Sequence, residues 1–86
     1  MKIVINDCFG GFSISEEAKK YCEENSSYNI SRTNEKLIEF IEKYGSERAS
    51  GMCAKLKIVE IPDDVDWEIE ENDGNEWVAE VHRTWE

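Results

Sequence analysis

The strongest structural signal in this 86-residue chain is the tripeptide Asn72-Asp73-Gly74, which separates two runs of alternating apolar and charged residues. Turn residues between alternating runs are typical of a β-hairpin, and we expect its strands over residues 65–70 and 76–83. A two-residue turn would mix apolar and charged side chains on both faces. A three-residue loop with the glycine left-handed places Ile69 opposite Trp77 and gathers nearly all apolar residues on one side. The pattern therefore favours the three-residue loop.

The net charge of −10 is confined to the part of the chain that holds this hairpin. Residues 1–59 contain nine acidic and nine basic side chains, whereas residues 60–86 contain eleven acidic side chains and a single basic one, Arg83. Such an acidic balance argues against direct binding to nucleic acid or to an anionic membrane surface, because both select for lysine and arginine. We therefore expect a neutral scaffold with one strongly acidic face.

The side of the hairpin opposite its apolar residues is expected to carry a row of carboxylates. Along the first strand they recur at every second residue, about 6.6–6.8 Å apart. Such a row can imitate the phosphates of a nucleic-acid strand and occupy a basic cleft, and it can equally serve only solubility and edge protection. Both interpretations stay open. The expected partner-binding residues are Asp64, Asp66, Glu68, Glu70, Glu76 and Glu80, with Trp85 as an aromatic anchor.

The remainder of the chain predicts two helices and two further strands. Ser15 is a suitable helix N-cap, and Gly45 is a suitable residue to end a second helix. The expected order is β-α-α-β-β-β, which makes residues 1–86 a single α+β domain with two helices on one face of a mostly antiparallel sheet. The expected elements before the hairpin are a strand over 2–6, a helix over 16–24, a helix that begins near Thr33 or Asn34 and stops at Gly45, a loop over 46–53 and a strand over 55–61.

Four aromatic residues are expected in the core. Phe9 and Phe12 flank a Gly-Gly pair after the first strand, in a tight turn that carries both rings inward. Trp67 and Trp77 share strand parity with the apolar face of the predicted hairpin.

The cysteines and the single histidine do not indicate a metal site or a catalytic centre. Cys8, Cys22 and Cys53 have no C-x-x-C spacing, and an odd number of cysteines favours the reducing cytoplasm over a secreted disulfide framework. No apolar run approaches the roughly 20 residues of a membrane span. An exposed row of carboxylates gives no reason for the unequal pKa values that acid–base catalysis requires. We therefore expect a cytoplasmic, non-enzymatic protein without metal or cofactor.

A different class of function is also compatible with the sequence. A small-ligand binder that sequesters a nucleotide signal would need a loop near the phosphate and convergent cations. The residues expected to supply such a site are Gly10, Gly11, Arg32, Arg48 and Arg83. A third possibility is a homo-oligomer in which a sheet edge pairs with a copy of itself.

Two segments carry a resemblance to known proteins. They are residues 2–18, KIVINDCFGGFSISEEA, and residues 57–71, KIVEIPDDVDWEIEE, with the following stretch to residue 85. The chain resembles a group of short proteins from tailed phages and prophages. The resemblance implies a phage accessory protein in the host cytoplasm and transfers no catalytic residue. By analogy of lifestyle, it implies an inhibitor of a host defence or nucleic-acid-handling protein, including an anti-CRISPR protein that acts as a DNA mimic.

Overall fold

The computed structural model describes residues 1–81, and within them the α+β class and the β-α-α-β-β-β order are confirmed. One short helix is added in the segment expected to be a loop. The elements are β1 (Lys2–Asn6), α1 (Glu16–Tyr21), α2 (Glu35–Tyr44), α3 (Ser46–Ala49), β2 (Leu56–Glu60), β3 (Trp67–Asn72) and β4 (Asn75–Glu80).

Local signals in the sequence set the helix boundaries. The Ser15 hydroxyl accepts a hydrogen bond from the Ala18 N–H, and the Asn34 side chain caps α2 by accepting from two backbone N–H groups. Gly45, at φ 95°, ends α2 in a conformation that favours glycine. Helix α1 is shorter than predicted, since it ends at Tyr21 and not near Glu24. Glu23 has a left-handed φ of 56°, which is incompatible with a continued helix.

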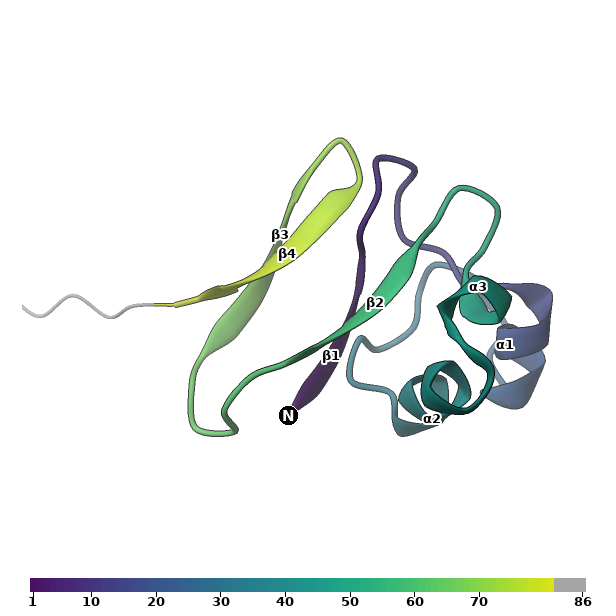
Figure 1. Ribbon diagram of the computed structural model, residues 1–86, viewed down its shortest axis with the longest axis horizontal. Helices are drawn as coiled ribbons and strands as arrows, with labels where there is room; N and C mark the ends of the chain where they lie inside the picture. Colours follow the sequence, from purple (N-terminus) through teal and green to yellow (C-terminus); the bar gives the residue numbers. More distant parts are fainter. Residues whose placement is uncertain (82–86) are drawn as a thin grey trace, which may run out of the picture.

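Strands β1 and β2 form an antiparallel pair whose one face packs on the three helices. Val4 and Leu56 point to this side and are almost fully buried. They join Leu37 and Phe40 of α2 and Ala18 of α1 in one hydrophobic cluster. In Figure 1 the helices accordingly lie together on one side of β1 and β2.

The β3–β4 hairpin lies on the other side of this strand pair (Figure 1). Ile3 and Ile5 alternate with Val4 and therefore point away from the helices, yet they are 0% and 4% exposed. Strand β4 contacts β1. The four strands thus form two separate two-stranded sheets, and the hairpin closes the face of β1 that the helices leave open.

The predicted hairpin register is wrong. Asn72 pairs with Asn75 across a two-residue turn in which Asp73 and Gly74 both have positive φ, at 52° and 90°. Ile69 therefore lies opposite Val78, and Glu70 lies opposite Trp77. The mixed faces that argued against this register are tolerated because one of the charged residues on the inner face, Glu76, finds a cation inside the protein.

Two of the four aromatic residues expected in the core are exposed. Phe12 is 8% exposed and joins the core as predicted, whereas Phe9 is 68% exposed. Trp67 is half-buried, and Trp77 is 43% exposed because the observed register turns it to the outer face of the hairpin. Trp85, the expected interface anchor, lies outside the described residues, as do His82 and Arg83.

Candidate acidic interaction surface

The carboxylates that the sequence placed in one row are divided between two faces of the hairpin. Glu68 and Glu70 lie on the outer face with Trp77, as the alternation of side chains along β3 requires. Glu76 and Glu80 lie on the opposite face, with Trp67 and Ile69. We define the acidic hairpin surface by its exposed carboxylates, which are Asp64, Asp66, Glu68, Glu70, Glu71, Asp73 and Glu80.

Most of these carboxylates have no counter-charge. Within residues 1–81, the ion pairs of the acidic segment are those of Asp63 with the amino terminus, at 2.6 Å, and of Glu76 with Arg32. No cation of this part of the chain lies within ion-pair distance of Asp64, Glu68, Glu70, Glu71, Asp73 or Glu80. The hairpin therefore keeps uncompensated negative charge on both faces, with Glu68 and Glu70 on the outer face and Glu71 and Glu80 on the opposite face.

Trp77 contributes an aromatic side chain to this surface. Its indole Nε1–H donates a hydrogen bond to Glu70 Oε2 at 3.0 Å, directly across the two strands. An exposed tryptophan with its polar edge satisfied is a typical interface residue, since the ring supplies apolar area at low entropic cost. Trp77 was not among the predicted partner-binding residues, because the predicted register placed its side chain on the inner face. The dipeptide Asp73-Gly74, typical of a two-residue turn, was the signal that could have found it.

Glu76 is not available to a partner. Its side chain is 7% exposed, and its two carboxylate oxygens accept hydrogen bonds from Arg32 Nη1 and Nη2 at 2.6 and 2.8 Å. Oε1 also accepts the Asn6 backbone N–H at 2.8 Å. The Arg32 guanidinium lies 3.6 Å from the ring centroid of Phe12 and donates to the Val4 carbonyl at 3.3 Å. This bidentate pair joins the hairpin to β1 and to the segment before α2.

Asn6 provides the second link between the hairpin and the scaffold. It is 0% exposed, and its Nδ2 donates to the carbonyls of Cys8 and Gly74 at 2.8 and 2.7 Å. Its Oδ1 accepts the Lys55 N–H at 2.8 Å. One buried amide therefore ties the start of β2 and the turn of the hairpin to the end of β1. The hairpin is held by polar contacts at its inner face, which leaves its outer face free.

The residues expected to form an anion site are not brought together. Arg32 is occupied by Glu76, whereas Arg48 forms an ion pair with Glu17 and lies 4.9 Å from the ring centroid of Tyr44. The hydrogen bond to the Glu17 carboxylate raises the pKa of Arg48. Arg83 lies outside the described residues.

The Gly10-Gly11 loop lies against two neighbouring segments, the Cys53 loop and the hairpin turn. A Cβ added at Gly10 would overlap the Cys53 carbonyl, and a Cβ added at Gly74 would lie 2.5 Å from the Gly11 nitrogen. Gly10 thus permits close contact with Cys53, and Gly74 permits close contact between the hairpin turn and Gly11.

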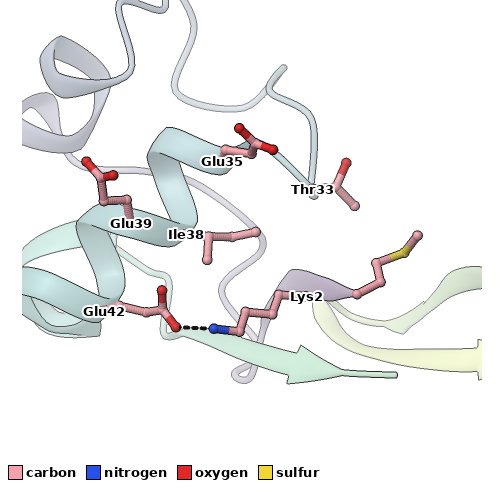
Figure 2. Close-up of a pocket in the computed structure, with 7 residues that line it drawn as sticks. Lys2, Thr33, Glu35, Ile38, Glu39 and Glu42 are labelled. Atoms are coloured by element: carbon pink, nitrogen blue, oxygen red, sulfur yellow. Dashed lines mark hydrogen bonds and ion pairs between the residues drawn. The ribbon is translucent and has the colours of Figure 1, made fainter. Parts of the chain in front are cut away.

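A pocket of about 450 Å³ lies between α2 and the start of β1 (Figure 2). Lys2 Nζ donates to Glu42 Oε2 at 2.5 Å, which raises the pKa of Lys2, and Glu35 and Glu39 add further carboxylates to the lining. Such a lining does not suit a nucleotide phosphate. In the described part of the chain no three side chains meet that could hold a metal ion, and no helix is long and apolar enough to cross a bilayer.

The comparisons with known proteins give no family or relative. No protein-family model, no curated protein and no solved structure matches this chain.

Proposed function

We propose that this protein is a non-enzymatic binding protein that docks the acidic hairpin surface into a basic cleft of a partner protein. The observation that carries the proposal is the exposed, uncompensated charge of Glu68, Glu70, Glu71 and Glu80 on a hairpin that is otherwise firmly attached. Oppositely charged surfaces steer association and fix orientation, and their attraction acts over about a Debye length.

The chemistry of the surface favours a partner that normally holds nucleic acid. Glu68 and Glu70 point the same way from one strand, about 6.6–6.8 Å apart, and Trp77 lies beside them. A regular row of anions next to an aromatic ring resembles the charge and stacking features of a nucleic-acid strand, for which grooves with basic and aromatic residues are built. The resemblance to phage proteins extends the proposal to a host defence or nucleic-acid-handling protein, such as a CRISPR nuclease, in the host cytoplasm.

The exposed carboxylates of the hairpin are concentrated in a short stretch of chain. Glu68, Glu70 and Glu71 lie within four residues of one another on β3, and all three are solvent-exposed. A surface kept for solubility alone does not need its charges concentrated on one hairpin, because dispersed charges serve that purpose as well.

The experiment compares two double charge reversals that change the net charge equally. The first is Glu68→Lys with Glu70→Lys on the hairpin, and the second is Glu35→Lys with Glu47→Lys on the helices, where neither residue forms an ion pair within residues 1–81. Each immobilised protein is used to capture proteins from extract of the host cell at low and at high salt. We expect the hairpin variant to lose a partner that the wild type and the helix variant retain.

Three results together support the proposal. The captured protein binds nucleic acid, duplex DNA releases it from the wild type, and its affinity falls steeply as salt is added. Equal capture by the wild type and both variants, or capture that does not respond to salt, would show that the acidic surface serves solubility alone.

A further inference from the structure

The hydrogen bonds of the hairpin show which backbone groups of β3 face away from β4. The Val81 N–H donates to the Asp66 carbonyl at 2.9 Å, in the same register as the strand pair. In an antiparallel pair, residues that bond to the partner strand alternate with residues whose N–H and C=O point away. The even-numbered residues of β3 therefore bond to β4, and Trp67, Ile69 and Glu71 present their backbone to the outer edge.

This outer edge of β3 is unpaired within the described chain. The sheet that holds β3 has two strands, and the outward N–H and C=O groups of Trp67, Ile69 and Glu71 receive no bond from any other segment of residues 1–81. Strand β4 packs against β1, and the hairpin lies at one end of the molecule (Figure 1). An unpaired strand edge is a template for a further strand.

The side chains beside this edge are carboxylates and half-buried apolar groups. Glu68 and Glu70 lie on the outer face of the hairpin, and Trp67, Ile69 and Glu71 lie on the opposite face. The three glutamates are exposed and have no cation of residues 1–81 within ion-pair distance. Trp67 and Ile69 are half-buried and keep apolar surface in contact with solvent. An added strand therefore meets three negative positions and two apolar ones.

We propose that the outer edge of β3 binds an extended basic segment of a partner protein, which pairs with β3 as a third strand of the hairpin. This binding mode rests on the proposed function, because it specifies the part of a basic partner that contacts the acidic hairpin surface. In strand addition the backbone hydrogen bonds supply affinity, and the alternate side chains supply specificity. Antiparallel pairing is slightly more stable per residue than parallel pairing, so the segment is expected to run antiparallel to β3.

The side chains of β3 define the sequence that such a segment needs. Basic residues opposite Glu68, Glu70 and Glu71 form opposite-charge cross-strand pairs, and apolar residues opposite Trp67 and Ile69 cover their exposed surface. In the antiparallel direction, from Glu71 to Trp67, the complementary segment is Lys-Lys-Val-Lys-Val. The partner is thus expected to offer a short strand in which three basic residues and two apolar residues follow this order.

The edges of the other sheet suit this segment less well. The outer edge of β1 is occupied by the chain segment before α2. At the outer edge of β2 the Leu56 N–H is already bonded to Ser50 Oγ at 2.9 Å. Strand β2 carries one basic and one acidic residue, Lys57 and Glu60, and therefore has no net attraction for a basic strand. Charge complementarity selects β3.

The test uses three synthetic peptides that contain Lys-Lys-Val-Lys-Val and carry the same charge. The first is unmodified, and the second has N-methyl groups on the three residues opposite Trp67, Ile69 and Glu71, whose amides bond to β3. The third has N-methyl groups on the other two residues, whose amides point away. By isothermal titration calorimetry, we expect the second peptide to bind at least about tenfold more weakly than the other two. Equal affinities of the first two, or no binding of the first at about 1 mM, overturn the strand addition.

Amide hydrogen exchange measures where the peptide lies. At saturating peptide, the exchange of the outward N–H groups of Ile69 and Glu71 is expected to slow at least about tenfold. The Ile58 N–H is the matched control, because the odd-numbered residues of β2 bond to β1 and this group points outward from the other sheet. Its exchange rate is expected to stay the same. Protection of Ile58 without protection of Ile69 and Glu71 would contradict the assignment to β3.

Two variants separate the backbone edge from the charge. Glu71→Pro removes an outward N–H of β3 together with a carboxylate, and Glu71→Gln removes the carboxylate alone. We expect the first to weaken binding of the unmodified peptide about tenfold or more, and the second about twofold to fivefold. Circular dichroism checks that both variants fold, and the methylated peptides decide the question if the proline variant does not.

The proposed function and the strand addition fail separately. Suppose that Glu68→Lys with Glu70→Lys abolishes binding of all three peptides, whereas neither methylation nor Glu71→Pro has an effect beyond that of Glu71→Gln. The acidic hairpin surface then attracts a basic partner, as the proposed function requires, and the pairing with the edge of β3 is wrong.

Discussion

The helical scaffold and the hairpin treat their carboxylates in opposite ways. Four scaffold carboxylates pair with cations on the surface, where ion pairs contribute little to stability and serve mainly to cancel charge. The hairpin buries one carboxylate against Arg32 and leaves most of the others exposed without a counter-charge. The scaffold pairs are Glu16 with Lys19, Glu17 with Arg48, Glu23 with Lys36, and Glu42 with Lys2.

The residues that attach the hairpin to the scaffold are different from the residues that carry its exposed charge. The hairpin is attached through Glu76 and through the Asn6 amide, both on its inner side and both buried. Its outer face can therefore carry uncompensated charge without detaching from the scaffold. The arrangement suits a surface whose charge is meant for another molecule.

The largest effect is expected from removing the cation that holds the hairpin. Arg32→Ala leaves Glu76 buried without a counter-charge and is expected to lower the free energy of unfolding by about 3–5 kcal/mol, measured by urea denaturation. Arg48→Ala removes a comparable cation from the exposed pair with Glu17, and we expect a much smaller loss. Equal losses in the two variants would contradict the distinction between the two regions.

A smaller effect is expected from filling the contact between the hairpin turn and the first loop. Gly74 and Gly45 have similar positive φ values, 90° and 95°, but only at Gly74 would a Cβ collide, 2.5 Å from the Gly11 nitrogen. Gly45 has a ψ of 156°, which together with its positive φ is a conformation open almost only to glycine, so its replacement by alanine is strained without any collision. A greater loss in Gly74→Ala than in Gly45→Ala therefore reports the close contact. We expect Gly74→Ala to lose about 1–3 kcal/mol more than Gly45→Ala in denaturant unfolding. Similar losses would show that the turn does not depend on this contact.

The smallest effect concerns the scaffold alone and appears only at alkaline pH. The Tyr21 hydroxyl donates a hydrogen bond to the Glu39 carboxylate, which, with some desolvation, raises the pKa of Tyr21 to about 12. The folded protein then keeps a proton that the unfolded chain releases near pH 10, so this contribution to stability is lost as the pH rises from about 10 to 12. An ultraviolet titration is expected to show one late-ionising phenol.

Two variants identify that phenol. In Tyr21→Phe the late ionisation is expected to disappear. In Glu39→Gln the pKa of Tyr21 is expected to move down toward 10, because the carboxylate that accepts the hydrogen bond from the hydroxyl is gone. A late ionisation that persists in Tyr21→Phe would assign it to another tyrosine.

The features of the fold that could be predicted are those whose causes lie close together in the chain. Ser15 caps α1 and Gly45 ends α2 as expected, since such a signal needs only the next few residues. The position of the hairpin turn was likewise predicted correctly, although the loop has two residues and not the predicted three. The exposure of Trp77 could not be predicted, because it depends on which segments pack against the hairpin.

By itself the sequence determined that the net charge is confined to residues 60–86, the part of the chain that holds the hairpin, and that this hairpin turns at Gly74. Only the tertiary structure decided which carboxylate is buried and which tryptophan is exposed. An alternating pattern predicts that every charged side chain of a strand faces the solvent. That prediction fails for Glu76, because the buried carboxylate is paired with Arg32. Arg32 lies 44 residues from Glu76 along the chain. Because the guanidinium offsets the cost of burying Glu76, it also selects the register that turns Trp77 outward.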